Sequence, residues 1–258
     1  MPLRRVKRRV MLQLNLQTDF SKTDLIHIIA KKLKLANYLE LCTHSTGNYY
    51  REIDRARFRT ARRLMYNCPA NFDDGLPIDF RISDFDISPA LKKLKMAFDR
   101  VNVCLVDGWH TYDCAIRDLA CAYDMLADGG VLIVHDCLPE SEQSASPTWV
   151  SGFWSGASYR AYLDFVLPRH DLDYCTVNVD HGCGIIFKKR AVNIVNDVPS
   201  SAARSELVSA WFTNHNNDKT AYDFFMRHHP KLLRLVSARD FIRGLGRPAI
   251  QKSGELTL

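Results

Sequence analysis

The chain has 258 residues, of which 47% are hydrophobic and 25% are charged, and its formal net charge is +6. This is the composition of an ordinary globular protein, with enough length for one substantial hydrophobic core and a small appendage. No apolar run approaches the ~20 residues that span a bilayer. The eight cysteines include no Cys-x-x-Cys pair. We therefore expect a soluble cytoplasmic protein without a membrane span or a disulfide framework.

The start of the chain is basic, with five arginines and lysines among residues 1–10. A nucleic-acid-binding arm and a solvated tail both fit this pattern, and we favour the tail because no aromatic residues are interleaved. A helix is predicted over 23–35, where apolar residues recur at three- and four-residue spacing. Ser21 or Thr23 is expected to cap it.

The first strand is predicted at 38–43, followed by a turn that reaches Gly47. Residues 62–67 and 78–82 are the candidates for the second and third strands. A further helix is predicted from Ser88, because Pro89 is tolerated in a first turn.

The most informative stretch runs from Val101 to Pro139. It contains two short apolar runs, typical of strands buried on both faces of a parallel sheet, with helical periodicity between them. The Asp128-Gly129-Gly130 sequence is expected to stop that helix. Because Asp107 and Asp136 each follow a strand of one βαβ unit, both carboxylates should lie at the sheet edge where open α/β folds bind ligands.

A long polar segment follows Pro139 and precedes a helix at 159–168. We interpret it as a loop that covers a substrate. Its aromatic residues either line an acceptor pocket or pack on the sheet edge, and the residues concerned are Trp149, Phe153 and Trp154.

The last part of the domain contains an antiparallel strand pair, predicted around the Asp180-His181-Gly182 turn. Short helices are expected from Ala191 onward. We divide the chain into a basic arm with a lead-in helix (1–36), a central domain (37–190) and a helical C-terminal extension (191–258).

The stretch VDGWHTYDCAIRDLACAYDMLADGGVLIVHDCLP resembles the second half of a class I S-adenosylmethionine-dependent methyltransferase domain. The resemblance rests on a D-G-x-H-x-Y turn after the fourth strand and a G-G-x5-D pattern that ends the fifth. It extends over roughly residues 38–189. It implies an α/β fold with a doubly wound, mainly parallel Rossmann-like sheet, an antiparallel last strand and a C-terminal helical appendage.

The resemblance also assigns residues to a S-adenosylmethionine site. In the turn after the first strand, Glu40 and Gly47 match the family pattern, whereas Cys42 stands where a glycine is usual and Thr43 follows it. Glycine at that position lets a cofactor approach the backbone. Asn67 or Cys68 stands where the family has a ribose-binding acid. Asp84 would either lie toward the adenine or cap a helix. Asp107 is the last of the expected cofactor-binding residues.

A branch of this superfamily methylates hydroxyls with the help of a divalent cation. By that resemblance, Asp107 and Asp136 would hold Mg²⁺, although Cys137 replaces the third ligand. His110 corresponds to the general base. The alternatives are that the two acids only bind the cofactor or cap helices, and that His110 is a turn residue. We interpret His135 as a strand-end histidine packed on a neighbour.

The leading functional hypothesis is O-methylation of a hydroxyl on a sugar, glycan or small metabolite, with S-adenosylmethionine as donor. Two alternatives stay open: a metal-dependent enzyme that uses the same sheet edge without S-adenosylmethionine, and a non-catalytic binding protein on a degenerate methyltransferase fold. Nucleic acid is not an expected partner, and the sequence leaves a homo-oligomer open.

Overall fold

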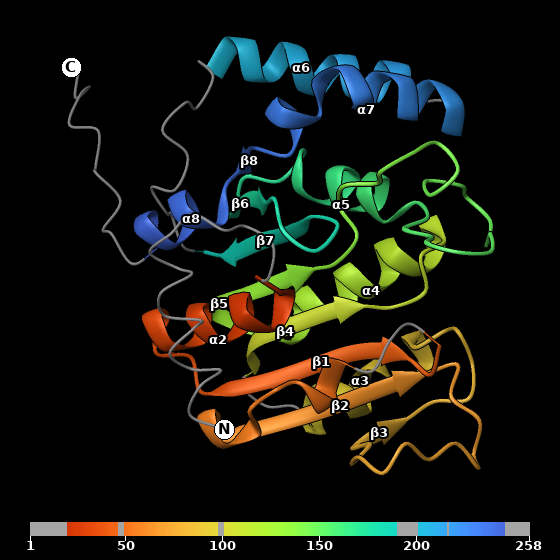
Figure 1. Ribbon diagram of the computed structural model, residues 1–258, viewed down its shortest axis with the longest axis vertical. Helices are drawn as coiled ribbons and strands as arrows, with labels where there is room; N and C mark the ends of the chain where they lie inside the picture. Colours follow the sequence, from red (N-terminus) through yellow and green to blue (C-terminus); the bar gives the residue numbers. More distant parts are fainter. Residues whose placement is uncertain (1–19, 46–48, 98–100, 190–200, 216, 246–258) are drawn as a thin grey trace.

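The computed structural model describes residues 20–45, 49–97, 101–189, 201–215 and 217–245. Its centre is one twisted sheet, with strands in the order β3-β2-β1-β4-β5-β7-β6-β8 (Figure 1). Only β7 runs antiparallel to its neighbours in this sheet, and every other pairing is parallel. The strands are β1 (Asn37–Thr43), β2 (Thr60–Tyr66), β3 (Phe80–Arg81), β4 (Val101–Asp107), β5 (Leu126–Val134), β6 (Leu172–Val177), β7 (Cys183–Lys188) and β8 (Leu235–Val236).

Helices cover both faces of the sheet, which confirms the predicted doubly wound α/β architecture. One face packs against α3, α4 and α5, with α6 and α7 beyond them, and the opposite face packs against α2 and α8. The helices are α2 (Lys22–Leu33), α3 (Leu91–Ala97), α4 (Tyr112–Met125), α5 (Ser158–Val166), α6 (Ser201–Asn214), α7 (Asp218–Leu232) and α8 (Ala238–Gly244), with 3-10 turns η2 (Tyr49–Arg51), η3 (Arg55–Arg57) and η4 (Ser88–Ala90). None of the described helices is long and apolar enough to cross a membrane.

The start of α2 is fixed by a capping box. The Ser21 hydroxyl accepts a hydrogen bond from the Asp24 N–H, and the Asp24 carboxylate accepts one from the Ser21 N–H. Such reciprocal bonds satisfy two of the donors that a helix start leaves without partners. Of the two predicted caps, Ser21 is therefore the one used, and Lys22 becomes the first residue of the helix.

The helix between β4 and β5 ends earlier than predicted. It stops at Met125, and β5 already begins at Leu126, which pairs with Val101 before a shift in register. The expected stop at 128–130 is therefore wrong. Gly129 does adopt the positive φ of +77° that glycine favours, but within β5. The register shift between β4 and β5 accommodates this backbone conformation within the strand, so β5 starts before the glycines.

The C-terminal extension contains a strand that the sequence pattern does not predict. The antiparallel pair β6 and β7 forms around the 180–182 turn as expected. Beyond it, however, helix α7 continues through Pro230, and Leu235–Val236 then pairs in parallel with Thr176–Val177 as β8. A two-residue strand has too few positions for a period of two to show in the sequence. All eight cysteines are buried and free, as expected for a chain without a disulfide framework.

Candidate active site

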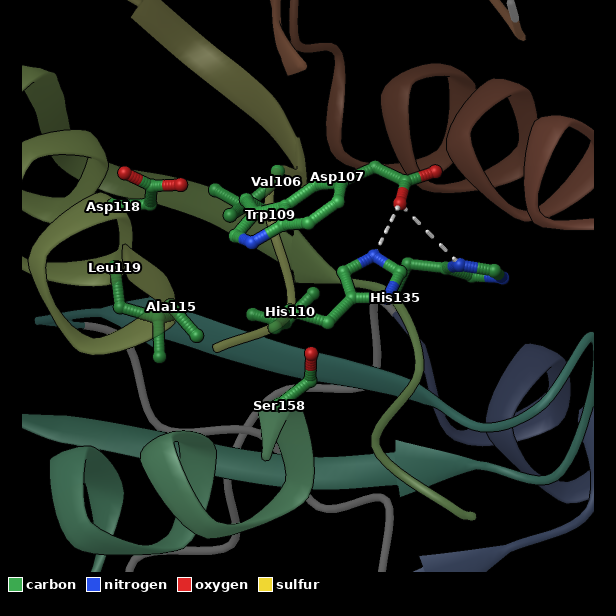
Figure 2. Close-up of a pocket in the computed structure, with 11 residues that line it drawn as sticks. Val106, Asp107, Trp109, His110, Ala115, Asp118, Leu119, His135 and Ser158 are labelled. Atoms are coloured by element: carbon green, nitrogen blue, oxygen red, sulfur yellow. Dashed lines mark ion pairs between the residues drawn. The ribbon is translucent and has the colours of Figure 1, made fainter. Parts of the chain in front are cut away.

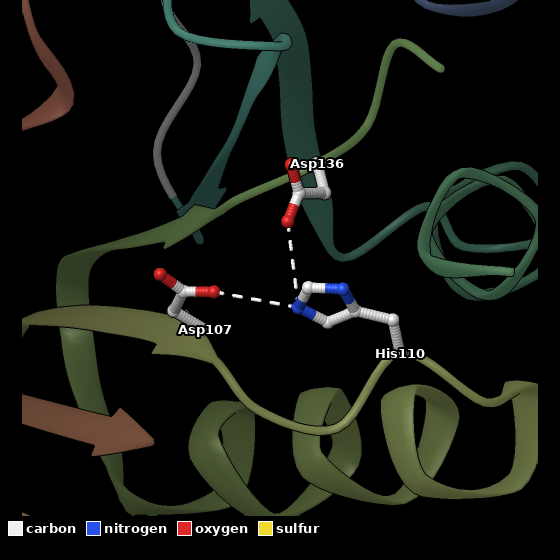
Figure 3. Close-up of side chains that lie close together, drawn as sticks. All are labelled: Asp107, His110 and Asp136. Atoms are coloured by element: carbon white, nitrogen blue, oxygen red, sulfur yellow. Dashed lines mark ion pairs between the residues drawn. The ribbon is translucent and has the colours of Figure 1, made fainter. Parts of the chain in front are cut away.

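Two acidic residues meet at the carboxyl ends of β4 and β5. Val106 pairs with Val134, and the His135 N–H donates to the Val106 carbonyl oxygen, so Asp107 and Asp136 emerge side by side. Figure 3 shows both carboxylates pointing toward the imidazole of His110. The His110 Nε2 lies 3.5 Å from Asp107 Oδ1 and 3.4 Å from Asp136 Oδ2. The sheet thus brings together the three residues predicted to be catalytic.

The imidazole of His110 is held in one tautomer. Its Nδ1 lies 2.8 Å from the Trp154 carbonyl oxygen, and a carbonyl oxygen can only accept, so Nδ1 carries the hydrogen. In the neutral ring the lone pair is then on Nε2, the nitrogen that faces the two acids. That Nε2 is buried and makes no hydrogen bond. A histidine oriented in this way can take a proton at Nε2.

The glycine of the D-G-x-H turn is required by close packing. A Cβ on Gly108 would overlap the Asp118 carboxylate and the Tyr66 hydroxyl. That hydroxyl donates to Asp118 and accepts the Trp109 N–H, so it ties the turn to helix α4. Asp118 is fully buried, and burial raises the pKa of its carboxyl to about 7 despite the hydrogen bond from Tyr66. This bonded group sets the position of the backbone that carries His110.

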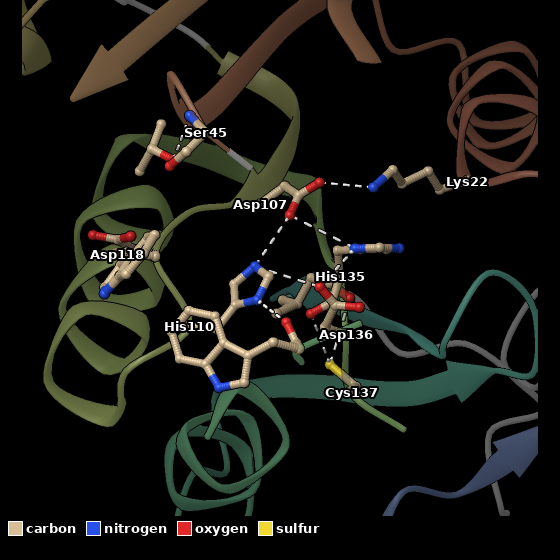
Figure 4. Close-up of polar contacts among 12 residues, drawn as sticks. Lys22, Ser45, Asp107, His110, Asp118, His135, Asp136 and Cys137 are labelled. Atoms are coloured by element: carbon tan, nitrogen blue, oxygen red, sulfur yellow. Dashed lines mark hydrogen bonds and ion pairs between the residues drawn. The ribbon is translucent and has the colours of Figure 1, made fainter. Parts of the chain in front are cut away.

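Three further side chains, from three separate parts of the chain, complete a charged cluster at this edge, and Figure 4 shows two of them, Lys22 and His135. Lys22 reaches from α2 and places its Nζ 2.7 Å from Asp107 Oδ2, with no exposed surface. His135 Nδ1 lies 3.0 Å from Asp136 Oδ2, and its Nε2 lies 3.4 Å from Asp180 Oδ1. His135 is therefore a member of the charged cluster and does more than pack on a neighbour at the end of a strand.

The charges in this cluster stabilise one another. Burial would raise the pKa of Asp107, but attraction to Lys22 and His135 holds it well below its usual range. Burial opposes the charges on His135 and Lys22, yet their acidic neighbours outweigh it and raise both pKa values, that of His135 strongly. For Asp180, the His135 imidazole overcomes the effect of burial and lowers the pKa to about 2. The cluster thus balances carboxylates with cations of the chain itself.

The same cluster is the candidate metal site, because one ligand atom from each of Asp107, His110 and Asp136 lies within 4.8 Å of the others. The surrounding residues fit a divalent cation poorly, however. The Lys22 ammonium already contacts Asp107. Cys137 is a buried thiol near the Val134 carbonyl oxygen, and burial raises the pKa of this thiol well above its usual range. A metal-binding cysteine must be deprotonated. Position 137, where the family pattern has a third oxygen ligand, therefore offers no ligand to Mg²⁺, and the third group of the cluster is the His110 imidazole.

Comparison with known proteins identifies the domain. Residues 23–137 match the family model described as a methyltransferase domain. By this match, residues 23–137 are a methyltransferase domain. The match confirms the predicted superfamily and enzyme class. No curated protein sequence matches the chain.

Several solved structures resemble this methyltransferase in shape. The O-methyltransferase TomG from Streptomyces achromogenes, solved with S-adenosylmethionine, is 14% identical over 66% of this chain and 80% of its own, with a TM-score of 0.48. The Bacillus cereus O-methyltransferase, solved with S-adenosylhomocysteine, is 12% identical over 70% of this chain and 88% of its own, with a TM-score of 0.46. MycE of the mycinamycin pathway, solved with Mg, S-adenosylhomocysteine and mycinamycin VI, is 15% identical over 67% and 50%, with a TM-score of 0.40. Similarity at this level says nothing about the reaction.

The predicted cofactor turn begins where β1 ends. Glu40, Cys42 and Thr43 are all buried there, and Cys42 lies opposite Asp107 in the register of β1 and β4. Burial raises the pKa of Glu40 to about 7, although the hydrogen bond from Tyr38 opposes this. The fourth predicted residue of the turn, Gly47, lies outside the described residues. The structure therefore brings the first three to the same edge as Asp107.

The ends of β2 and β3 lie next to this turn. The Asn67 N–H donates to the Asp84 carbonyl oxygen at 2.9 Å, and Asn67 has a φ of +45°. The Asp84 side chain is exposed and accepts the Asp86 N–H, as in an Asx turn. Cys68 is buried with Cys42 in a small apolar cluster that also contains Met65. Cys42 thus stands at the position predicted for a glycine, and either Asn67 or Cys68 stands at that predicted for a ribose-binding acid.

The three aromatic residues of the 140–157 segment take different places. Trp154 is buried and meets the His110 ring at 5.4 Å and the Trp109 ring at 5.0 Å between centroids. Phe153 stacks on His181 at 3.8 Å, whereas Trp149 is 62% exposed.

Between His110 and α4 lies a cavity of about 10 Å³, the size of one water molecule, which Figure 2 shows with its lining residues.

Proposed function

We propose that this methyltransferase domain transfers the methyl group of S-adenosylmethionine to a hydroxyl of a sugar, glycan or small metabolite, with His110 as general base. The observation that carries the proposal is the geometry of His110. Its Nε2 is buried, makes no hydrogen bond and lies between two carboxylates at the ligand-binding edge of the sheet. This nitrogen is the one left free for a proton by the bond from Nδ1 to Trp154.

The acids beside His110 support this role. When the imidazole takes the acceptor proton it becomes a cation, and Asp107 and Asp136 stabilise that charge at 3.5 and 3.4 Å. Burial lowers the pKa of His110, but the Asp107 and Asp136 carboxylates that face Nε2 raise it overall above its ordinary value. The base therefore acts in its neutral form above that pKa. A sulfonium cation bound near the cluster would lower the pKa of His110 again and so favour its neutral, basic form.

S-adenosylmethionine would supply an electrophilic methyl carbon, and the electron pair of its broken carbon–sulfur bond would leave on sulfur. The acceptor oxygen forms the new bond to that carbon, and its proton passes to His110 Nε2. The residues we expect to hold the cofactor are those of the carboxyl edge: Glu40, Cys42, Thr43, Gly47, Asn67, Asp84 and Asp107. The role of the chain in this step would be to hold the two reactants in line and to exclude water.

The aromatic side chains next to His110 support an acceptor with an apolar ring face. Phe85, Trp109 and Trp154 follow one another at centroid separations of 5.6 and 5.0 Å. Binding sites for small molecules combine such walls with a few polar groups that fix orientation. A sugar ring offers both a hydroxyl for His110 and an apolar face for the indoles.

A second candidate function is binding without catalysis. The observation that favours it is the apolar cluster of Cys42, Met65 and Cys68, which replaces the polar groups expected around the ribose. In that case the fold would bind a partner at the same edge without transferring a methyl group. Calorimetry with S-adenosylhomocysteine separates the two candidates, because only the methyltransferase requires this cofactor product to bind.

The experiment that tests the proposed reaction is methyl transfer from trideuteromethyl-labelled S-adenosylmethionine to a panel of sugars and phenols, followed by mass spectrometry. His110→Ala should lower turnover by roughly 10²–10⁴-fold, the usual contribution of a general base. The matched control is His170→Ala, which removes an exposed histidine and should keep the parent rate. Equal rates in the parent and His110→Ala would assign the base to another residue.

A further inference from the structure

Lys22 is unlike the other lysines of helix α2. Lys31 and Lys32 are exposed at the far end of the helix, as is the C-cap residue Lys34, whereas the Lys22 side chain has no exposed surface. Its ammonium lies 2.7 Å from Asp107 Oδ2 and 3.2 Å from the centre of the Tyr49 ring. An ammonium removed from water in this way requires a specific opposite charge.

The position of Lys22 is fixed by its neighbours on every side. The capping box of Ser21 and Asp24 starts the helix one residue before it, and its own N–H donates to Asp180 Oδ2 at 3.3 Å. The helix packs on the sheet through the core that includes Val103 and Leu105. Since side chains alternate along β4, Asp107 points to the same face as these two residues. The lysine and the acid are thus directed at each other by two separate elements.

We propose that the Lys22 ammonium takes the place of a divalent cation at this acid cluster, so that the site works without a metal. The inference rests on the proposed methyltransferase function and concerns how its acids are neutralised. Lys22 contacts Oδ2 of Asp107, and the two imidazoles face Oδ1. A divalent ion bound to Asp107 would lie beside a buried ammonium, and their repulsion would be strong in a medium of low dielectric constant.

The second acid also faces imidazoles of the chain. His135 Nδ1 lies 3.0 Å and His110 Nε2 lies 3.4 Å from the same oxygen, Asp136 Oδ2, whereas the buried Oδ1 makes no hydrogen bond. The position after Asp136 is a cysteine whose sulfur lies 3.4 Å from the Val134 carbonyl oxygen, and not an oxygen ligand of the kind that Mg²⁺ prefers. The chain therefore has its own cation where a metal-dependent enzyme would need one.

The test is calorimetric titration of the EDTA-treated full chain with MnCl₂ and with MgCl₂. We compare the parent with Lys22→Met, which keeps the apolar stem and removes the charge, and with Lys32→Met, an exposed lysine of the same helix. The parent and Lys32→Met should show no stoichiometric binding. Lys22→Met removes the ammonium from Asp107 Oδ2 and should bind Mn²⁺ at least about tenfold more tightly. Lys22→Arg keeps the charge, should exclude metal like the parent, and serves if Lys22→Met does not fold.

Stoichiometric binding of Mn²⁺ or Mg²⁺ to the parent would overturn the proposal, and so would equal metal affinity in the parent and Lys22→Met. Titration with S-adenosylhomocysteine in excess EDTA gives a second readout, in which the parent should bind equally well with and without metal. If S-adenosylhomocysteine fails to bind under both conditions, the proposed function fails. The metal titration still decides the role of Lys22 in that case.

Discussion

Gly156 offers a test of how His110 is positioned. It has a φ of +58°, and a Cβ built on it would overlap the His110 carbonyl oxygen and would lie 2.6 Å from the His110 Cβ and 2.9 Å from the carbonyl carbon. An ordinary contact begins at about 3.4 Å, so relief of the Cβ contact alone requires Gly156→Ala to displace the His110 backbone by about 0.8 Å, and the carbonyl oxygen requires more. The same backbone accepts the Ala157 N–H at 2.7 Å.

The expected cost of Gly156→Ala has two parts. The left-handed backbone conformation costs an alanine about 1–2 kcal/mol, and weakening the bond from Ala157 costs about 1–3 kcal/mol. Gly152→Ala is the matched control, because Gly152 lies in the same loop with a φ of +95° and has nothing within 4 Å of an added Cβ. It should lose only the first part.

Urea unfolding of both variants measures this difference, and the proton titration of the His110 ring by NMR reports its surroundings. Displacements near 1 Å can slow catalysis about 10²-fold, so Gly156→Ala should also be the less active variant on any acceptor found. Equal losses of stability in the two variants, together with an unchanged His110 titration, would refute the reasoning.

Three further predictions follow from groups already described. Asp118 has a folded pKa of about 7, above its unfolded value near 3.9, so its stability contribution is lost as pH rises from about 4 to about 7. Asp118→Asn should reduce this loss of stability, measured by urea unfolding across that pH range, and an unchanged slope would contradict the assignment. The rate with a hydroxyl acceptor should rise with pH to a midpoint above ~6.5, because His110 must be neutral to act and its pKa is raised; a rate independent of pH over this range would argue against His110 as base. Cys42→Gly should bind S-adenosylhomocysteine more tightly in calorimetry while losing roughly 0.5–3 kcal/mol of stability, since it opens the cofactor turn but removes a buried side chain; weaker binding would mean that Cys42 does not crowd the cofactor.

The acid pair could be predicted from the sequence because both residues follow strong strand signals. Parallel neighbouring strands bring their carboxyl ends to one edge, so Asp107 and Asp136 had to lie close together. His110 followed from its distance of three residues from Asp107. These inferences need only local patterns and one rule of sheet topology.

The rest of the cluster could not be predicted in this way. Lys22 and Asp180 are distant in sequence from Asp107, by 85 residues in the case of Lys22, and no local pattern pairs them. Alternation along β4 gives a partial signal, because Asp107 points to the face that Val103 and Leu105 share. It does not tell which helix covers that face. The identity of α2 as the covering helix, and of Lys22 as its inward residue, came only from the structure.

The central claim is that this chain uses S-adenosylmethionine at the edge formed by β1, β4 and β5. Its most direct test is isothermal titration of the purified full chain with S-adenosylhomocysteine, first in excess EDTA and then with Mg²⁺. The account predicts one binding site per chain with the same affinity in both conditions. The absence of any binding heat in both, with a thermal midpoint that the ligand leaves unchanged, would contradict it.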